Sequence, residues 1–230
     1  MLKPWIEAQA RLVDIAAGRA PADLVIRGGI WVNVHTRELI ANTDIAIADG
    51  RVAYVGPDAG PAIGPETQLI EANGRYMLPG LIDAHMHVES GMLTPAGFAA
   101  AVIPHGTTTM FHDPHEIANV MGLQGVRLMR DESLIQPVSM FTQMPSCAPS
   151  APGLETTGSP ISEGEVAQAM GWEGIIGLGE MMNFPGVIAG DRQMLAEIAA
   201  TRAVGKTVGG HYASPDLGRA FHAYVAGGAN

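Results

Sequence analysis

The chain has 230 residues, and 47% of them are hydrophobic, a composition that allows a buried core and argues against a disordered segment. Its formal net charge of -10, with no lysine- or arginine-rich run, argues against nucleic acid as a polymeric partner. The sequence has no apolar stretch of about 18 residues and no leader-like N-terminus, and its one cysteine, Cys147, excludes an internal disulfide. We therefore expect a cytoplasmic protein that does not enter a membrane.

Residues 1–20 are predicted to form an N-terminal helix that packs on another part of the protein and ends near Gly18. Residues 21–76 are predicted to form a small β domain, because short β-like runs are divided by turn residues and Asp49-Gly50 is typical of a hairpin turn. The helix is predicted from apolar residues at helical spacing, which are Trp5, Ala8, Leu12, Ile15 and Ala16.

Residues 77–230 are predicted to form an α/β domain in which short apolar strands alternate with helices, as in a parallel sheet. One of these helices is expected to run continuously over IANVMGLQGVRLMRDE. Polar residues follow nearly every strand, which favours a TIM-type barrel over an open doubly wound sheet. Because a complete (β/α)8 barrel needs roughly 250 residues, we expect its first five βα units and a truncated barrel. The five strands lie in MLPGLIDAH, GTTTMFHD, PVSMFTQM, GIIGLGEM and KTVGGH.

Two histidines end the first of these strands. Side chains alternate along a strand, so Asp83, His85 and His87 are predicted to share one face. Histidines two residues apart at a strand end can both offer a ring nitrogen to zinc, iron or manganese. The alternative is that they are ordinary polar residues at a strand end. Asp83 is expected to orient a ligand rather than to bind the metal itself.

A glutamate and a further histidine end the fourth and fifth strands. Glu180 closes an otherwise apolar strand, and an unpaired buried carboxylate costs several kcal/mol unless a cation offsets that cost. Lys206 opens its strand at the opposite end, so a metal is the better partner for Glu180, although a structural, hydrogen-bonded glutamate is the alternative. His211 adds a ligand from a third strand, which is how barrel sites are assembled.

The segment FHDPHEIAN follows the second strand and contains His112, Asp113, His115 and Glu116. We expect it to line the mouth of the same pocket and to contact substrate, a further metal or a proton in transfer. The alternative is a loop in which Asp113 or His115 caps the next helix.

Four stretches of the chain resemble the adenine deaminase branch of the amidohydrolase superfamily, from about Asp23 to the end. They are PGLIDAHMHVESGMLTP, VIPHGTTTMFHDPHEIANVMG, PSCAPSAPGLETTGS and GLGEMMNFPGVIAGD. The resemblance implies a β-sandwich-like composite domain before a distorted TIM barrel. It matches His85 and His87 to the family's His-x-His pair, Glu180 to a metal-bridging residue and His211 to the fifth-strand histidine.

Two features depart from the family pattern. Tyr212-Ala213-Ser214-Pro215 replaces a shorter His-Ala-Pro run, and the sixth-strand histidine and the eighth-strand aspartate of the family are not in the sequence. The resemblance also adds candidates to the residues expected to contact the substrate or the metal ligands. The full set of these candidates is Asp83, Glu89, His112, Asp113, His115, Glu116 and Glu155.

The implied reaction is the hydrolytic deamination of adenine to hypoxanthine and ammonia by a metal-activated hydroxide, a step of purine catabolism, with Glu180 and His211 as catalytic groups. The implied cofactors are two divalent ions, Mn²⁺ or Fe²⁺ with Zn²⁺ as an alternative. The implied partners are a small purine substrate and further copies of the chain in a homo-oligomer. One alternative is another dinuclear amidohydrolase that acts on a cyclic amide or a different aminopurine. Another is a non-catalytic fragment that needs a complementary chain.

Overall fold

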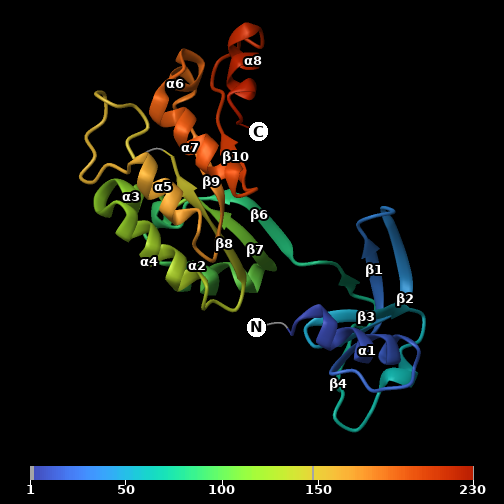
Figure 1. The fold of residues 1–230 in the computed structure, drawn as a ribbon. Helices are drawn as coiled ribbons and strands as arrows, with labels where there is room; N and C mark the ends of the chain where they lie inside the picture. The colour runs from blue at the N-terminus through green and yellow to red at the C-terminus, as the bar shows by residue number, and fades with distance from the viewer. Residues whose placement is uncertain (1–2, 147, 230) are drawn as a thin grey trace. The chain divides into compact units, whose positions relative to one another are not determined.

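A computed structural model describes residues 3–146 and 148–229, so that Cys147 lies outside the described residues. The chain divides into two compact units, Met1–Pro79 and Gly80–Asn230, which are described separately (Figure 1). Among the described residues, every helix is too short or too polar to cross a membrane.

The first unit is built on a five-stranded sheet with the order β3-β2-β1-β4, in which β5 also pairs with β1. β1 and β2 are antiparallel, as are β2 and β3, whereas β4 and β5 run parallel to β1. Asp49 and Gly50 both have positive φ angles, 51° and 70°, as a type I′ hairpin turn requires, which confirms the predicted hairpin. The strands are β1 (Leu24–Asn33), β2 (Glu38–Ala48), β3 (Arg51–Gly56), β4 (Gln68–Glu71) and β5 (Tyr76–Met77).

Helix α1 (Trp5–Ala16) packs on one face of this sheet. Leu12 and Ile15 are buried against Val25 of β1 and against small residues of β2. Trp5 was predicted on this buried face but is 63% exposed, because it is the first residue of the helix and its ring lies beside Arg51 instead.

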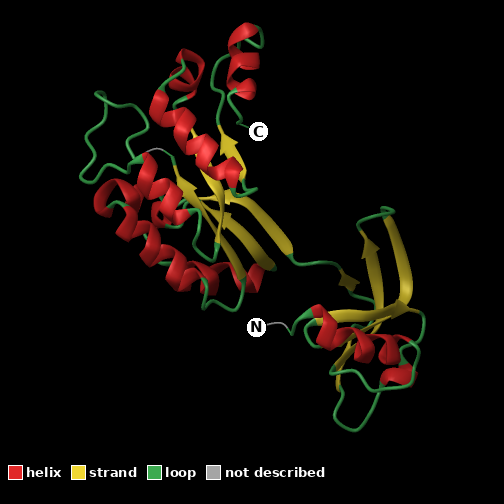
Figure 2. Ribbon diagram, in the orientation of Figure 1, coloured by secondary structure: helices red, strands yellow, loops and turns green. Residues whose placement is uncertain are grey.

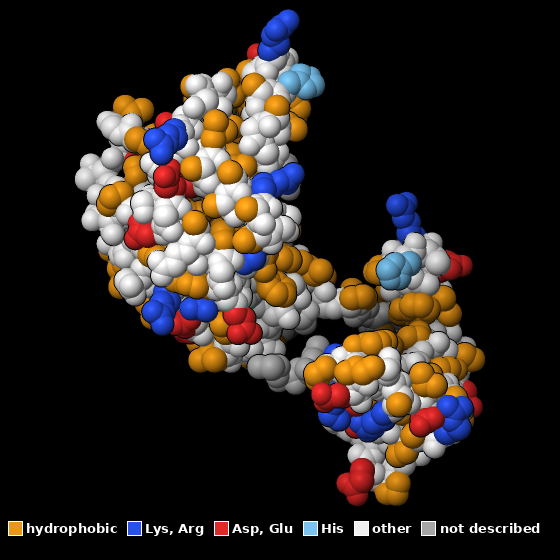
Figure 3. Space-filling model, viewed as in Figure 1, with side chains coloured by type: hydrophobic (Ala, Val, Ile, Leu, Met, Phe, Trp, Pro, Cys, Tyr) orange, Lys and Arg blue, Asp and Glu red, His pale blue; other side chains and the backbone are white. Residues whose placement is uncertain are grey.

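The opposite face of the same sheet forms an apolar hollow with a volume of about 370 Å³. It is lined by Ile26, Ile45 and Ile47, which alternate along their strands with the residues facing α1. Figure 3 shows hydrophobic side chains gathered over the surface of this unit.

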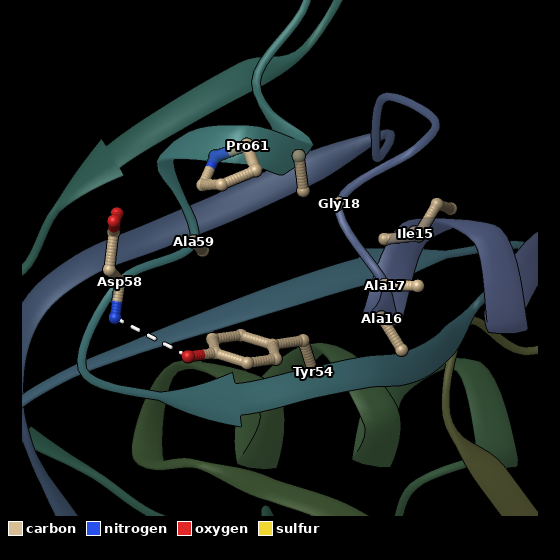
Figure 4. A pocket seen from close by; sticks show the side chains of 9 residues that line it. Ile15, Ala16, Ala17, Gly18, Tyr54, Asp58, Ala59 and Pro61 are labelled. Atoms are coloured by element: carbon tan, nitrogen blue, oxygen red, sulfur yellow. Dashed lines mark hydrogen bonds between the residues drawn. The ribbon is translucent and has the colours of Figure 1, made fainter.

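A second hollow of about 230 Å³ lies where the end of α1 meets the 3-10 helix η1 (Gly60–Ala62) (Figure 4). Its wall is formed largely by Ala, Gly and Pro residues, and the Tyr54 hydroxyl accepts a hydrogen bond from the Asp58 amide at 3.4 Å. These residues offer little chemistry for binding a metal or a polar ligand.

The second unit contains a curled sheet of five parallel strands in the order β10-β9-β8-β7-β6, with its helices gathered on one side (Figure 2). This arrangement confirms the predicted fold class of a partial TIM-type barrel preceded by a small β unit. Strands β6 and β10 form the two edges of the sheet. The strands are β6 (Leu81–Met86), β7 (Thr107–His112), β8 (Ser139–Pro145), β9 (Ile175–Met181) and β10 (Thr207–Gly210).

The prediction of one continuous helix over IANVMGLQGVRLMRDE is wrong. The structure has two helices there, separated by Gly122, whose φ of 60° and ψ of -144° suit glycine alone. Helix α6 was not predicted. The helices of this unit are α2 (Pro95–Val102), α3 (His115–Met121), α4 (Leu123–Ser133), α5 (Glu163–Ala169), α6 (Phe184–Ala189), α7 (Arg192–Ala203) and α8 (Arg219–Ala226), with short 3-10 helices η2 (Glu89–Gly91) and η3 (Ile103–His105).

Candidate metal centre

The carboxyl ends of the parallel strands bring histidines from two segments around one glutamate from a third. His85 lies in β6, and His87 follows the end of that strand. Glu180 is next to last in β9, and His211 comes directly after β10. In a parallel sheet these ends share one edge, which explains why residues far apart in the sequence meet.

The ring nitrogens of the histidines point at one oxygen of Glu180. The Nε2 atoms of His87 and His211 each lie 3.1 Å from Glu180 Oε1, and His85 Nε2 contacts the same oxygen. Glu180 is only 5% exposed, so its carboxylate is largely shielded from water, whereas the side chains of His85 and His211 are partly open to it. The rings of His85 and His87 meet edge to face, with centroids 4.9 Å apart.

A backbone carbonyl determines which nitrogen of His87 carries the hydrogen. His87 Nδ1 donates to the carbonyl oxygen of Asp113 at 2.8 Å. When the ring is neutral, Nε2 is then a bare lone pair that faces the carboxylate of Glu180. Two electron-rich atoms at 3.1 Å repel each other unless a proton or a metal cation lies between them.

The residues present therefore fit a divalent metal ion. One ligand atom each from His85, His87 and Glu180 lies within 4.8 Å of the others. Imidazole nitrogen with carboxylate oxygen is a donor set that suits manganese, iron or zinc. The backbone hydrogen bond to His87 is the type of outer contact that orients a metal-binding histidine.

The second oxygen of Glu180 faces a different residue. Glu180 Oε2 lies 3.1 Å from Nδ1 of His115, the first residue of α3. Burial by itself raises the pKa of Glu180, but hydrogen bonds from His115 and His211 and the charge of nearby imidazoles outweigh it and leave the pKa below its usual range. Glu180 therefore offers a carboxylate rather than a carboxylic acid.

The backbone of Glu180 is itself unusual, with a φ of 34° where residues other than glycine rarely lie. Its carbonyl oxygen accepts hydrogen bonds from the Met182 amide at 2.5 Å and from Ser146 Oγ at 2.9 Å. Such local strain is held in place by the surrounding structure and is commonly found at functional sites.

Asp113 is completely buried beside this cluster, 3.8 Å from His115 Nδ1. Burial raises the pKa of Asp113 well above its usual range. Gly179 makes room for its carboxylate, because a Cβ atom at that position would lie 2.0 Å from Asp113 Oδ2. The predicted helix cap is wrong: Pro114 is the N-cap residue of α3, and neither Asp113 nor His115 caps the helix.

His112 faces away from the cluster. Its Nε2 atom lies 3.0 Å from Ser133 Oγ and 2.8 Å from Thr142 Oγ1, in the core between β7, β8 and α4. Burial, with a smaller contribution from the charge of His87, lowers the pKa of His112 to about 4. His112 is thus a neutral buried histidine at physiological pH.

Four acidic candidates lie around the cluster or away from it. The carboxylate of Asp83 accepts the His85 amide at 3.2 Å, and that of Glu89 accepts the Ile117 amide, also at 3.2 Å. Glu116 accepts a hydrogen bond from Ser90 Oγ at 2.5 Å, and this serine was not among the sequence candidates. Glu155 lies on an exposed loop, where its carboxylate accepts the Ser150 amide at 3.0 Å.

Comparison with proteins of known sequence identifies relatives along the whole chain. The chain is 87% identical over 230 residues to an adenine deaminase of Paracoccus denitrificans, a match that covers 100% of this chain and 38% of that protein. It is 72% identical over 224 residues to an adenine deaminase of Ruegeria pomeroyi (97% and 37%) and 52% identical over 226 residues to one of Moorella thermoacetica (98% and 38%). The chain thus spans less than two fifths of the length of these relatives.

Solved structures share the fold at low sequence identity. Phenylurea hydrolase B matches with a TM-score of 0.57 and 15% identity, over 90% of this chain and 58% of that protein. Molinate hydrolase matches with a TM-score of 0.55 and 15% identity, over 84% of this chain and 54% of that protein. The family model described as the amidohydrolase family matches residues 76–225, which include all five strands of the parallel sheet. The chain belongs to the amidohydrolase family.

Proposed function

We propose that the protein to which this chain belongs hydrolyses adenine to hypoxanthine and ammonia. The observation that carries the proposal is the convergence of His85, His87 and His211 on one buried oxygen of Glu180. The high identity to proteins named adenine deaminase supports the substrate, since the geometry of a metal centre alone does not select between purines and cyclic amides.

Divalent metal ions are part of the proposal, with manganese or iron as the expected elements. His85 and His87 would hold one ion, His211 would hold another, and Glu180 would be shared between them. When bound, such ions lower the pKa of a coordinated water and so supply a nucleophile near neutral pH.

The residues of this chain contribute position and shielding. The Asp113 carbonyl fixes His87 in the tautomer that presents Nε2 to the site. Glu180 is almost fully buried, which strengthens its electrostatic interaction with the surrounding groups. His115 lies against Glu180 and Glu116 against Ser90, and we propose that this part of the segment lines the mouth of the site, whereas His112 faces the core. Location in the cytoplasm and assembly into a homo-oligomer stay predictions.

A matched pair of substitutions tests the function. In protein expressed from its complete reading frame and supplied with Mn²⁺, we expect Glu180→Gln to lower ammonia release from adenine by at least about 10²-fold, the typical cost of losing a positioned catalytic group. Glu197→Gln makes the same chemical change at another buried glutamate, in α7, and should retain turnover. Normal turnover by Glu180→Gln would show that Glu180 has no part in the reaction.

The substrate is tested with the same protein. We expect adenine to be deaminated and a cyclic amide such as dihydrouracil to be left intact. Hydrolysis of the cyclic amide with no reaction on adenine would favour a different dinuclear amidohydrolase.

A further inference from the structure

Asp113 is a buried carboxyl group that has no hydrogen-bond partner for either oxygen among the described residues. It is 0% exposed, so water does not replace the missing partner at the surface. An unpaired buried carboxylate is costly, and such groups are usually paired or bound to a cation. The arrangement around Asp113 therefore requires an explanation beyond packing.

The atoms nearest to Asp113 form a set of potential metal ligands. Asp113, His115 and Glu180 each offer one ligand atom within 4.8 Å of the other two. His115 Nδ1 lies 3.8 Å from Asp113 Oδ1 and 3.1 Å from Glu180 Oε2. This set uses the oxygen of Glu180 that the other histidines do not face, since His85, His87 and His211 all contact Oε1.

Another nearby group of potential ligands is less suited to a cation. His87, His115 and Glu116 also lie within 4.8 Å of one another, but His87 Nδ1 carries the hydrogen that it donates to the Asp113 carbonyl. A nitrogen that carries a hydrogen has no lone pair for a metal. His87 Nδ1 must keep its hydrogen because a carbonyl oxygen can only accept. The hydrogen that His115 Nδ1 donates to the carboxylate of Glu180 can instead be replaced by a cation, and this difference favours the set that contains Asp113.

We propose that Asp113, His115 Nδ1 and Glu180 Oε2 bind a divalent cation in addition to the ions of the histidine cluster. The set has two carboxylates and one imidazole, whereas the histidine cluster has three imidazoles and one carboxylate. Harder, oxygen-rich sets favour Mn²⁺, Fe²⁺ and Mg²⁺, and imidazole-rich sets favour Zn²⁺ and Fe²⁺. The Asp113 site should therefore exchange Mn²⁺ for Mg²⁺ more readily than the histidine cluster.

Two residues of β9 have conformations that leave room for the proposed cation site at Asp113. Gly179 precedes Glu180, and any larger side chain there would collide with Asp113 Oδ2. The positive φ of Glu180 turns the chain immediately after this point. Together these two residues leave room for the Asp113 carboxylate and aim one oxygen of Glu180 toward it.

The experiment is a count of bound metal. Protein from the complete reading frame is stripped with a chelator and titrated with Mn²⁺, and free Mn²⁺ is followed by electron paramagnetic resonance. We expect Asp113→Asn and His115→Gln each to bind about one equivalent less than the unmodified protein, because binding depends on the number of ligands present. Glu197→Gln, the matched change at a buried carboxyl elsewhere, should bind the full number.

Competition with millimolar Mg²⁺ gives a second measurement. We expect Mg²⁺ to release about one equivalent of Mn²⁺ from the unmodified protein and none from Asp113→Asn. If Asp113→Asn melts far below the unmodified protein, its metal count is replaced by that of His115→Gln, which alters a side chain at the start of α3. Full Mn²⁺ binding and unchanged affinity in His115→Gln, or in a folded Asp113→Asn, would overturn the proposal.

The proposal shares Glu180 with the proposed function, and a double variant separates the two. His85→Asn with His87→Asn should lose metal from the histidine cluster and keep the Mg²⁺-sensitive equivalent. If the double variant binds the full number while Asp113→Asn binds less, the histidine cluster is not a metal centre and the Asp113 site stands. The reverse pattern retains the histidine cluster and rejects the Asp113 site.

Discussion

Two buried glutamates of the second unit show how neighbouring groups decide the charge of a carboxyl. Glu180 is surrounded by imidazoles, which hold its pKa below the usual range despite burial. Glu197 lies in α7 and is 1% exposed, and burial raises its pKa to about 7, with small further increases from Asp191 and Glu163 and an opposing effect from the Gln193 hydrogen bond. Glu180 therefore keeps a negative charge that can interact with a cation. Glu197 stays protonated to a higher pH, and its ionisation lowers the free energy of unfolding.

We predict that Glu197 makes the protein less stable as the pH rises. Its folded pKa of about 7 exceeds the ordinary value of 4.5, so the folded state holds the proton more tightly. The free energy of unfolding is then highest below pH 4.5 and decreases as the pH rises toward 7. Glu197→Gln should remove this decrease and stabilise the protein at pH 8 by on the order of 3 kcal/mol.

Urea unfolding at pH 5 and pH 8 measures this effect. The control is Glu173→Gln, an exposed glutamate in the turn before β9. Equal pH dependence in Glu197→Gln and the unmodified protein would show that Glu197 is already ionised or already compensated in the fold.

Strand alternation placed His85 and His87 on one face, and both side chains do reach Glu180. The relation between Glu180 and His115 could not be predicted in this way. His115 lies in a helix, where alternation has no meaning, and the backbone of Glu180 leaves the β region. The direction of each carboxylate oxygen follows from these local angles, which no spacing of residue types encodes.

At the level of elements, the apolar runs predicted the strands well. The bounds of the helices, in contrast, were set by single residues. Helix α6 has only six residues, which is too short for an apolar period to be detected. Its end signals were nevertheless present: Asn183 caps the Gly186 amide, Pro185 lies in the first turn and Gly190 ends the helix in the left-handed conformation. The capping residues therefore indicate this helix, although the apolar periodicity does not.

Gly122 separates α3 from α4, and we predict that replacing it destabilises the protein. A Cβ atom at Gly122 would lie 2.4 Å from Ser159 Oγ, and its backbone angles are strained for any other residue. Gly122→Ala should lower the free energy of unfolding by about 1–3 kcal/mol. Gly190→Ala is the matched control, since it also has a positive φ of 78° but no atom within 4 Å of the added Cβ. A loss at Gly122 no larger than at Gly190, measured by urea unfolding, would contradict the steric part of this prediction.

At the scale of the whole molecule, the open sheet determines how firmly the proposed metal ligands are held. His85 lies in β6 and His211 follows β10, and these are the two edge strands of the sheet. Edge strands lack a hydrogen-bonding neighbour on one side and are less restrained than central strands. Ligands on such strands bind a metal less tightly than ligands in a preformed site.

We predict from this that residues 1–230 alone have no more than trace adenine deaminase activity, even with manganese or iron added. The measurement is ammonia release from adenine by the purified 230-residue chain, compared with protein from the complete reading frame at equal metal concentration. Comparable turnover would show that the five-stranded sheet is sufficient to hold the centre.

The contact between His85 and Glu180 joins residues 95 positions apart, across a sheet whose intervening strands β7 and β8 must first be in place. We expect a contact of such long range to form after the local ones, because closing a long loop costs more conformational entropy. A metal ion held there would stabilise the native state more than the folding transition state, so that its removal would accelerate unfolding and leave the folding rate nearly unchanged. The ion would then govern the lifetime of the native fold, and thus its resistance to irreversible inactivation, in addition to any chemistry that it supports.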